Sequence, residues 1–162
     1  MALKDHIPNS ITSLNLVSGS LGIYFTLTLS PVVGAFFMGA AAVFDFADGF
    51  AARLLHARSA IGKELDSLAD VISFGLLPGI ILLKMISAAV NLPSVQINEI
   101  ELLPFIGLTV PVFAALRLAK FNLDTRQTDS FLGLPTPASG LLIASFPLIP
   151  EFSLYLSAFI FF

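Results

Sequence analysis

The chain has 162 residues, of which 56% are hydrophobic and 12% are charged, and its mean hydropathy is +0.92. Soluble domains average about 45–50% apolar and about 25% charged residues, so this composition indicates an integral membrane protein. A net charge of −3 argues against a nucleic-acid partner, and the lack of cysteine excludes disulfides, thiolate catalysis and cysteine-ligated metals. The length fits one domain of five or six helices of about 20 residues each.

The apolar segments predict six helices in a single transmembrane domain, residues 1–162. Pro8-Asn9-Ser10 indicates a turn into the first helix, with Asn9 or Ser10 as its N-cap. Pro78-Gly79 and Pro111 are expected to kink the third and fourth helices. The final apolar run is too short to span a membrane, and we expect it to be a truncated sixth helix. The expected helices cover about residues 11–29, 32–55, 64–89, 102–121, 136–148 and 152–162.

The positive charges predict how the domain is oriented in the membrane. Seven of the eight Lys and Arg residues fall at the N-terminus, near the 56–63 loop or around the 122–135 loop, which share one side of the membrane. The connections on the other side carry none, and Lys84 is the exception. Because cytoplasmic loops are enriched in Lys and Arg, we expect a protein of the cell (inner) membrane with its N-terminus and aspartates on the cytoplasmic side.

Four aspartates lie within an otherwise very apolar part of the chain, at Asp45, Asp48, Asp66 and Asp70. One carboxylate at the centre of a lipid-spanning helix costs about 2.5–3.5 kcal/mol on insertion scales. Four such residues are therefore expected near an interface, around a polar cavity or against cations.

Helical spacing places these acids on two stripes that can meet. The short connection at residues 56–63 makes the second and third helices antiparallel neighbours, and facing carboxylates repel one another unless cations lie between them. Ligands made only of oxygen suit Mg²⁺, Mn²⁺ or Ca²⁺ rather than Zn²⁺. Small residues beside the acids leave room for a metal-bound phosphate. The first stripe contains Asp45, Asp48, Gly49, Ala52 and Arg53, and the second contains Gly62, Asp66 and Asp70.

Two other interpretations explain part of this pattern. The acids could pair with Arg53, Arg58 and Lys63 in a solvated helix hairpin at the membrane surface. They could also line a cation or proton pathway, since intramembrane acids occur in transporters. The transporter interpretation leaves the Gly49, Ala52, Arg53 and Gly62 positions unexplained.

The segment Asp45–Asp70 resembles the signature of the CDP-alcohol phosphotransferases, Asp-x2-Asp-Gly-x2-Ala-Arg-x8-Gly-x3-Asp-x3-Asp, and every fixed position is filled. The resemblance implies an all-α, polytopic membrane protein with a six-helix core whose last helix is cut short here. It also implies transfer chemistry on a CDP-linked lipid, a divalent cofactor (Mg²⁺ or Mn²⁺, in a two-ion site) and a homodimer.

The resemblance further implies roles for individual residues. Asp45, Asp48 and Asp66 would hold a metal ion on the lipid diphosphate, whereas Asp70 would join a second metal site and act as general base. The nucleotide and its diphosphate would contact a wider set, in which Asn9 is alternatively a plain helix cap and Arg53 a snorkelling arginine. That set is Asn9, Thr12, Gly49, Ala52, Arg53 and Gly62.

The acceptor alcohol has to be read from a different part of the chain. The segments 117–122 and 131–137 resemble the phosphatidylserine synthase branch of the family, although Lys120 stands where that branch often has Arg. Arg117 can pair with a carboxylate in a bidentate manner, which suits L-serine, and Lys120 and Asn122 are the other candidate acceptor residues. Arg117 and Lys120 are alternatively cytoplasmic anchors.

These observations predict transfer of a phosphatidyl group from CDP-diacylglycerol to L-serine, giving phosphatidylserine and CMP. The alternatives are the same chemistry on glycerol 3-phosphate, an inositol compound or choline, and a cation or proton transporter.

Overall fold

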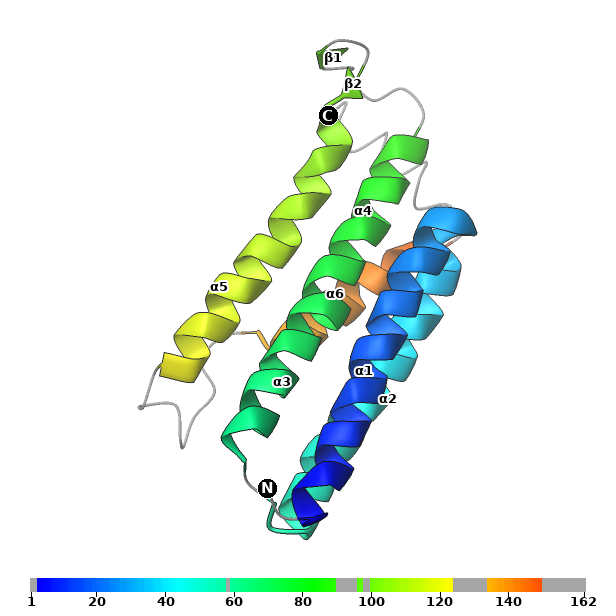
Figure 1. Cartoon of the computed structure of the whole chain (residues 1–162). Coiled ribbons are helices and arrows are strands. Elements are labelled where there is room, and N and C mark those ends of the chain that lie inside the picture. The colour runs from blue at the N-terminus through cyan, green and yellow to red at the C-terminus, as the bar shows by residue number, and fades with distance from the viewer. Residues whose placement is uncertain (1–2, 58, 90–95, 98–99, 124–133, 150–162) are drawn as a thin grey trace.

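The computed structural model describes residues 3–57, 59–89, 96–97, 100–123 and 134–149. These residues form a helical bundle with one small hairpin at its end (Figure 1). Within this part of the chain, three helical segments are long and apolar enough to cross a membrane, so the protein is an integral membrane protein and the predicted all-α fold is confirmed. The three segments are Pro31–Leu54, Ala60–Ala88 and Leu103–Leu123.

Helix α1 (Leu3–Thr28) begins well before the predicted start at residue 11, so the predicted N-cap at Asn9 or Ser10 is wrong. Pro8 lies inside α1, where it removes only one backbone hydrogen bond. The hydroxyls of Ser10, Thr12 and Ser13 each donate to the carbonyl four residues earlier, as they do in a continuous helix. The polar residues of this segment therefore belong to the helix surface and not to a turn.

Helix α2 (Pro31–Leu54) matches its predicted bounds within one residue. Ser30 is its N-cap, with an extended backbone and a side-chain oxygen that accepts from the Val33 N–H at 3.4 Å. Pro31 suits the first helical position because that position needs no N–H donor. The Ser30-Pro31 break between the first two helices is thereby confirmed.

Helix α3 (Ala60–Asp70) continues through a π-helical segment (Val71–Leu76) into α4 (Leu77–Ala88). Together they form one continuous rod, Ala60–Ala88, which begins four residues before the predicted start at residue 64. Ser59 caps the rod, because its side-chain oxygen accepts from the Gly62 N–H at 2.9 Å. The expected irregularity at Pro78-Gly79 lies instead in the turn before it. Pro78 has no N–H to offer the preceding turn, and the Leu77 N–H reaches back five residues to the Ile72 carbonyl.

The predicted 91–101 loop contains a small hairpin of two-residue strands, in which β1 (Gln96–Ile97) pairs antiparallel with β2 (Ile100–Glu101). The fourth predicted helix is a 3-10 segment (Leu103–Leu108) followed by α5 (Thr109–Leu123). Pro111 sits in the first turn of α5, next to the junction between the two helix types. The remaining helix, α6 (Thr136–Ser145), ends in a 3-10 turn (Phe146–Leu148) and matches its predicted bounds. The predicted sixth helix, 152–162, lies outside the described residues.

The helices pack closely through small residues. α1 and α2 run side by side, and α1 also packs against the π-helical segment and its two flanking helices. A Cβ added at Gly19 would overlap Ser73, and one added at Gly34 would overlap the Thr26 hydroxyl. Such positions let helix backbones approach within the bundle. Beyond the acids, toward the middle of the bundle, the core is apolar and contains Met38, Ala41, Phe74, Leu77, Ile81 and Met85.

The acidic stripes lie toward one end of this bundle. The start of α1, the end of α2 and the start of α3 lie at the lower end of Figure 1, α5 also ends on that side, and the hairpin lies at the opposite end. At 1.5 Å per residue, Asp66 is about 9 Å from the start of α3, and Asp45 is about 14 Å from the end of α2. The acids are therefore placed between the membrane surface and its centre, where a polar cavity can reach them.

Candidate active site

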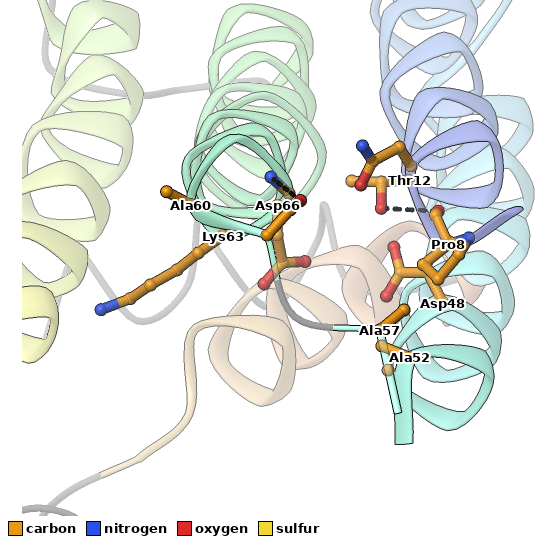
Figure 2. A pocket seen from close by; sticks show the side chains of 12 residues that line it. Pro8, Thr12, Asp48, Ala52, Ala57, Ala60, Lys63 and Asp66 are labelled. Atoms are coloured by element: carbon orange, nitrogen blue, oxygen red, sulfur yellow. Dashed lines mark hydrogen bonds between the residues drawn. The ribbon is translucent and has the colours of Figure 1, made fainter. Parts of the chain in front are cut away.

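Three of the four predicted metal ligands converge in the structure. Asp45 and Asp48 come from α2 and Asp66 comes from α3, and one carboxylate oxygen of each lies within 4.8 Å of those of the other two. The antiparallel arrangement of α2 and α3 produces this convergence, as the spacing of the stripes predicted. Figure 2 shows Asp48 and Asp66 on opposite sides of one cavity.

Asp70 completes the cluster from one turn deeper in the rod. Its side chain lies within hydrogen-bonding reach of Asp45, and only 8% of the residue is exposed. Asp48 is 5% exposed and lies within hydrogen-bonding reach of the Thr12 side chain. Among the described residues, Asp48 Oδ2 and Asp70 Oδ1 have no hydrogen-bond partner although both atoms are buried.

This donor set fits a divalent metal ion. Buried anionic oxygens without partners are costly, and several carboxylates held within a few ångströms of one another repel. A hard cation with oxygen ligands, such as Mg²⁺ or Mn²⁺, satisfies both requirements at once. The residues that would hold it are Asp45, Asp48 and Asp66, with Asp70 against Asp45.

A cavity of about 490 Å³ opens beside the acids at the same end of the bundle. It is large enough for a small-molecule headgroup, since ligand pockets usually measure about 300–1,000 Å³. Of the predicted nucleotide residues, five line it, and all are buried or half-buried. These five are Asn9, Thr12, Gly49, Ala52 and Gly62.

The small residues keep this cavity open for different reasons. A Cβ at Gly62 would lie 2.8 Å from both the Asn9 Oδ1 and the Ser59 Oγ, so Gly62 permits α1 to approach the start of α3. A Cβ at Gly49 would meet no atom within 4 Å and would project into open space. Asn9 is therefore positioned by contact with α3 and does not act as a helix cap.

Arg53 is the predicted nucleotide residue that does not line the cavity. Its side chain is exposed, and its Nε donates to the Gly49 carbonyl of its own helix at 3.0 Å. This geometry agrees better with the alternative of an arginine at the membrane edge. Its contact with a ligand remains a prediction.

The predicted acceptor residues lie on the other side of α3. The Arg117 Nη1 donates to the Thr136 hydroxyl of α6 at 2.5 Å, and the Asn122 Nδ2 donates to the Ser67 hydroxyl of α3 at 2.9 Å. A Cβ at Gly75 would contact Ala114 of α5. Asn122 thus faces Ser67, and Ala114 faces Gly75, which sets the antiparallel register of α5 against the rod. In this register, Arg117 lies opposite the turn that follows Asp70.

The remaining parts of the acceptor prediction differ in outcome. Lys120 is exposed, as expected of a surface anchor. Thr136 and Pro137 begin α6, while the rest of the 131–137 segment falls largely outside the described residues.

The comparisons with known proteins agree with this geometry. The family profile for CDP-alcohol phosphatidyltransferase matches residues 5–162. The chain belongs to the CDP-alcohol phosphatidyltransferase family. This membership confirms the resemblance carried by the Asp45–Asp70 motif.

Three relatives illustrate the similarity. A CDP-diacylglycerol–serine O-phosphatidyltransferase of Bacillus subtilis is 37% identical over 90% of this chain and 78% of its own length. One of Helicobacter pylori is 32% identical over 84% of this chain but 54% of its own length. An archaetidylserine synthase of Methanothermobacter thermautotrophicus is 35% identical over 95% of this chain and 63% of its own length. The chain thus spans less than two thirds of the length of the latter two, and no solved structure matches it significantly.

Sequence reasoning missed several residues of the site. Ser59, Ala57 and Lys63 line the cavity, and Asn15 is fully buried in α1 one turn beyond Thr12. Ser59 could have been found from its position as an N-cap three residues before Gly62. Asn15 lies outside the family signature, and only the packing of α1 against its neighbours buries it.

Proposed function

We propose that this protein transfers a phosphatidyl group from CDP-diacylglycerol to L-serine, giving phosphatidylserine and CMP. The observation that carries the proposal is the convergence of Asp45, Asp48 and Asp66 beside a cavity of nucleotide-headgroup size. The relatives named as serine phosphatidyltransferases supply the donor and acceptor classes. Family membership favours this transferase over a cation or proton transporter, which would leave the cavity-lining glycines without a role.

We propose that the acids bind Mg²⁺ or Mn²⁺, with Asp45, Asp48 and Asp66 at one ion and Asp70 at a second. Bound there, divalent ions would neutralise negative charge on the diphosphate and so favour nucleophilic attack at phosphorus. The cavity lined by Asn9, Thr12, Gly49, Ala52 and Gly62 would hold the CDP portion of the donor.

The chemistry at the reacting atoms is a substitution at the phosphorus on the lipid side of the diphosphate. The serine hydroxyl oxygen forms a new bond to that phosphorus, and the bond to the bridging oxygen breaks. CMP departs with the bridging oxygen and its electron pair. Asp70, the deepest acid of the cluster, takes the proton of the serine hydroxyl as general base.

Arg117 is the residue we propose for the serine carboxylate. Arg117 is half-buried and sits on α5 opposite the turn after Asp70, and its guanidinium donates to the Thr136 hydroxyl. A bidentate pair with the carboxylate would point the serine hydroxyl toward the acids. Asn122 would support this side of the site through Ser67, and Lys120, exposed near the end of α5, would serve as an anchor at the membrane surface.

The direct test is CMP release by the purified protein in detergent or vesicles. CDP-diacylglycerol and Mn²⁺ or Mg²⁺ are supplied with one alcohol at a time: L-serine, glycerol 3-phosphate, inositol or choline. We expect CMP and phosphatidylserine with L-serine and divalent metal, and neither product with a chelator. CMP with glycerol 3-phosphate but not with serine would refute the acceptor assignment only. No CMP with any alcohol, from protein that stays folded, would refute the transferase.

We also propose that the acidic end of the bundle faces the cytoplasm, because seven of the eight Lys and Arg residues fall in or beside the sequence segments of that end, with Lys84 as the exception. The chain has no cysteine, so single cysteines report accessibility cleanly. Exposed Glu64 and Ser87 lie near opposite ends of the Ala60–Ala88 rod. An impermeant maleimide added to intact cells should label Ser87→Cys, and it should label Glu64→Cys only after permeabilisation. The reverse pattern would overturn the orientation.

A homodimer is the assembly we propose, in line with the family resemblance. Exposed apolar side chains on α2 and α5, such as Phe36 and Phe113, leave these helices free to contact lipid or a second copy. Mass measurement of the detergent complex with its detergent contribution subtracted should give twice the 17.3 kDa of one chain. A single-chain mass at all concentrations would contradict the proposal.

A further inference from the structure

Asn15 is the buried polar side chain that the proposed mechanism leaves unused. The residue is 0% exposed, and neither its Nδ2 nor its Oδ1 has a hydrogen-bond partner among the described residues. Its backbone carbonyl is occupied, since it accepts from the Ser73 hydroxyl at 3.1 Å. A buried amide with both ends unpaired is unfavourable, so a fold that retains one is expected to use it when the site is loaded.

The register of α1 against α2 places Asn15 beside Asp45. Gly34 approaches Thr26 near one end of this helix pair, and Thr12 interacts with Asp48 near the other. In antiparallel helices, residues that lie at the same level have residue numbers with a constant sum. That sum is 60 for both of these contacts, and it is also 60 for Asn15 and Asp45. Asn15 of α1 therefore lies at the same level of the bundle as Asp45 of α2.

The contacts of α1 with the Ala60–Ala88 rod place Asn15 at the same depth in the bundle. Ser73, which binds the Asn15 carbonyl, lies three residues after Asp70 on the same rod. Asp70 in turn lies within hydrogen-bonding reach of Asp45. The unpaired Nδ2 donor of Asn15 and the unpaired Oδ1 acceptor of Asp70 are thus at one level of the bundle, and they are chemically complementary.

We propose that Asn15 is a positioning residue whose side-chain N–H holds the Asp70 carboxylate from the α1 side in the loaded site. The held carboxylate keeps one oxygen for the metal and the acceptor hydroxyl, because the other is engaged by the amide. A neutral donor suits this place, since a further carboxylate would add repulsion to the four acids and a cation would compete with the metal. The proposal rests on the proposed function for its kinetic part, but its binding part does not.

The first test is Mn²⁺ binding without substrate, followed by thermal unfolding of the detergent-solubilised protein across a Mn²⁺ titration. Asn15→Leu removes the amide while keeping a similar volume. We expect it to need at least tenfold more Mn²⁺ for half-maximal stabilisation, with no loss of melting temperature in the absence of metal. The matched control is Ser18→Ala, because Ser18 is buried on the same helix but donates to the Phe37 carbonyl at 2.8 Å, away from the acids. It should keep the wild-type Mn²⁺ midpoint.

The second test is the kinetics of CMP release with L-serine. Asn15→Leu should lower kcat at least tenfold and leave KM for CDP-diacylglycerol within threefold, because the cavity that holds the nucleotide is untouched. Ser18→Ala should change neither constant by more than threefold. Wild-type protein that is stabilised by Mn²⁺ but releases no CMP would refute the proposed function and would still allow the inference on Asn15 to be judged from the Mn²⁺ midpoint.

Asn15→Asp separates donation from metal ligation and keeps the shape of the side chain if Asn15→Leu fails to fold. Loss of the donor should weaken Mn²⁺ stabilisation and kcat, as in the leucine variant. Mn²⁺ binding by Asn15→Asp as tight as in the wild type would show that position 15 supplies an oxygen ligand, and it would overturn the proposal. Wild-type midpoints and kcat in Asn15→Leu, or an equal loss in Ser18→Ala, would also overturn it.

Discussion

The two sides of helix α3 are built in different ways. The side facing α1 and α2 carries carboxylates and a cavity, and its polar atoms are left partly unpaired. On the other side, Ser67 of α3 is hydrogen-bonded to Asn122 of α5, and the neighbouring Arg117 of α5 is hydrogen-bonded to Thr136 of α6. In the proposed function, the first side would bind the cations and phosphate, and the second would hold the small zwitterion. The difference separates the phosphate chemistry from the choice of acceptor.

Replacing the deepest acid should have the largest effect on this division. Asp70→Asn keeps the size of the side chain but removes the proposed general base, so kcat for CMP release should fall by about 10²–10⁴ or more. A smaller effect on KM for CDP-diacylglycerol is expected, because the cavity residues are unchanged. The measurement is CMP release under saturating Mn²⁺. Near-wild-type turnover would show that another group takes the proton.

Arg117 tests the acceptor side alone. Arg117→Lys keeps the charge and loses the planar fork, so kcat/KM for serine should fall by about 10–100-fold, equivalent to about 1.4–2.8 kcal/mol. KM for CDP-diacylglycerol should stay within threefold. Lys120→Gln is the matched control, because Lys120 is exposed on the same helix, and it should change both constants by less than threefold. Equal losses for both substrates in Arg117→Lys would remove the distinction between the two sides.

Gly62 tests the nucleotide side. Gly62→Ala places a methyl group 2.8 Å from the ends of the Asn9 and Ser59 side chains, which must then shift. Because these groups are side-chain ends, we expect only about a three- to tenfold increase in KM for CDP-diacylglycerol, or roughly 1 kcal/mol. Gly39→Ala is the control, since a Cβ there meets no atom within 4 Å and alanine favours the helix. An unchanged KM in Gly62→Ala would place the nucleotide elsewhere.

The smallest effect is expected at the Asn122–Ser67 hydrogen bond. Asn122→Ala removes a half-buried pair, which is worth about 0.5–1.5 kcal/mol of stability. Thermal unfolding should register this loss, while KM for CDP-diacylglycerol and the Mn²⁺ midpoint should not change. A weakened Mn²⁺ midpoint would mean that the two sides of α3 are coupled and do not act separately.

The comparison also explains which parts of the site the sequence could predict. Asp45, Asp48, Gly49 and Ala52 lie on one helix and their facing partners lie on the next, so a 3.6-residue period and a short loop were enough to bring them together. The bounds of α2 and α6 followed from Ser30-Pro31 and from the Thr136-Pro137 start. These features depend on contacts between near neighbours in the chain.

The features that escaped prediction depend on more distant contacts or on a locally ambiguous signal. Pro8 reads as a turn, but the hydroxyls around it bond back along α1 and keep the helix continuous. Asn15 has no special neighbour in sequence, and only the register with Asp45 and Ser73 shows its place. The Asn122–Ser67 pair joins residues 55 positions apart, which no periodicity can reveal.

The π-helical segment Val71–Leu76 joins the part of the rod that carries the acids to the part that packs in the apolar core. In an unbroken α-helix, the stripe through Asp66 and Asp70 would continue into Leu77 and Ile81, which are instead part of the apolar core. The wider π-helical turn takes up roughly one extra residue, and it therefore rotates α3 relative to α4 by about 100°. The segment therefore sets the rotation of the acids relative to Leu77 and Ile81, which pack with Met38 and Ala41 of α2. A deletion of a single residue in this segment would restore α-helical geometry and turn the acids away from α2 without changing any of them.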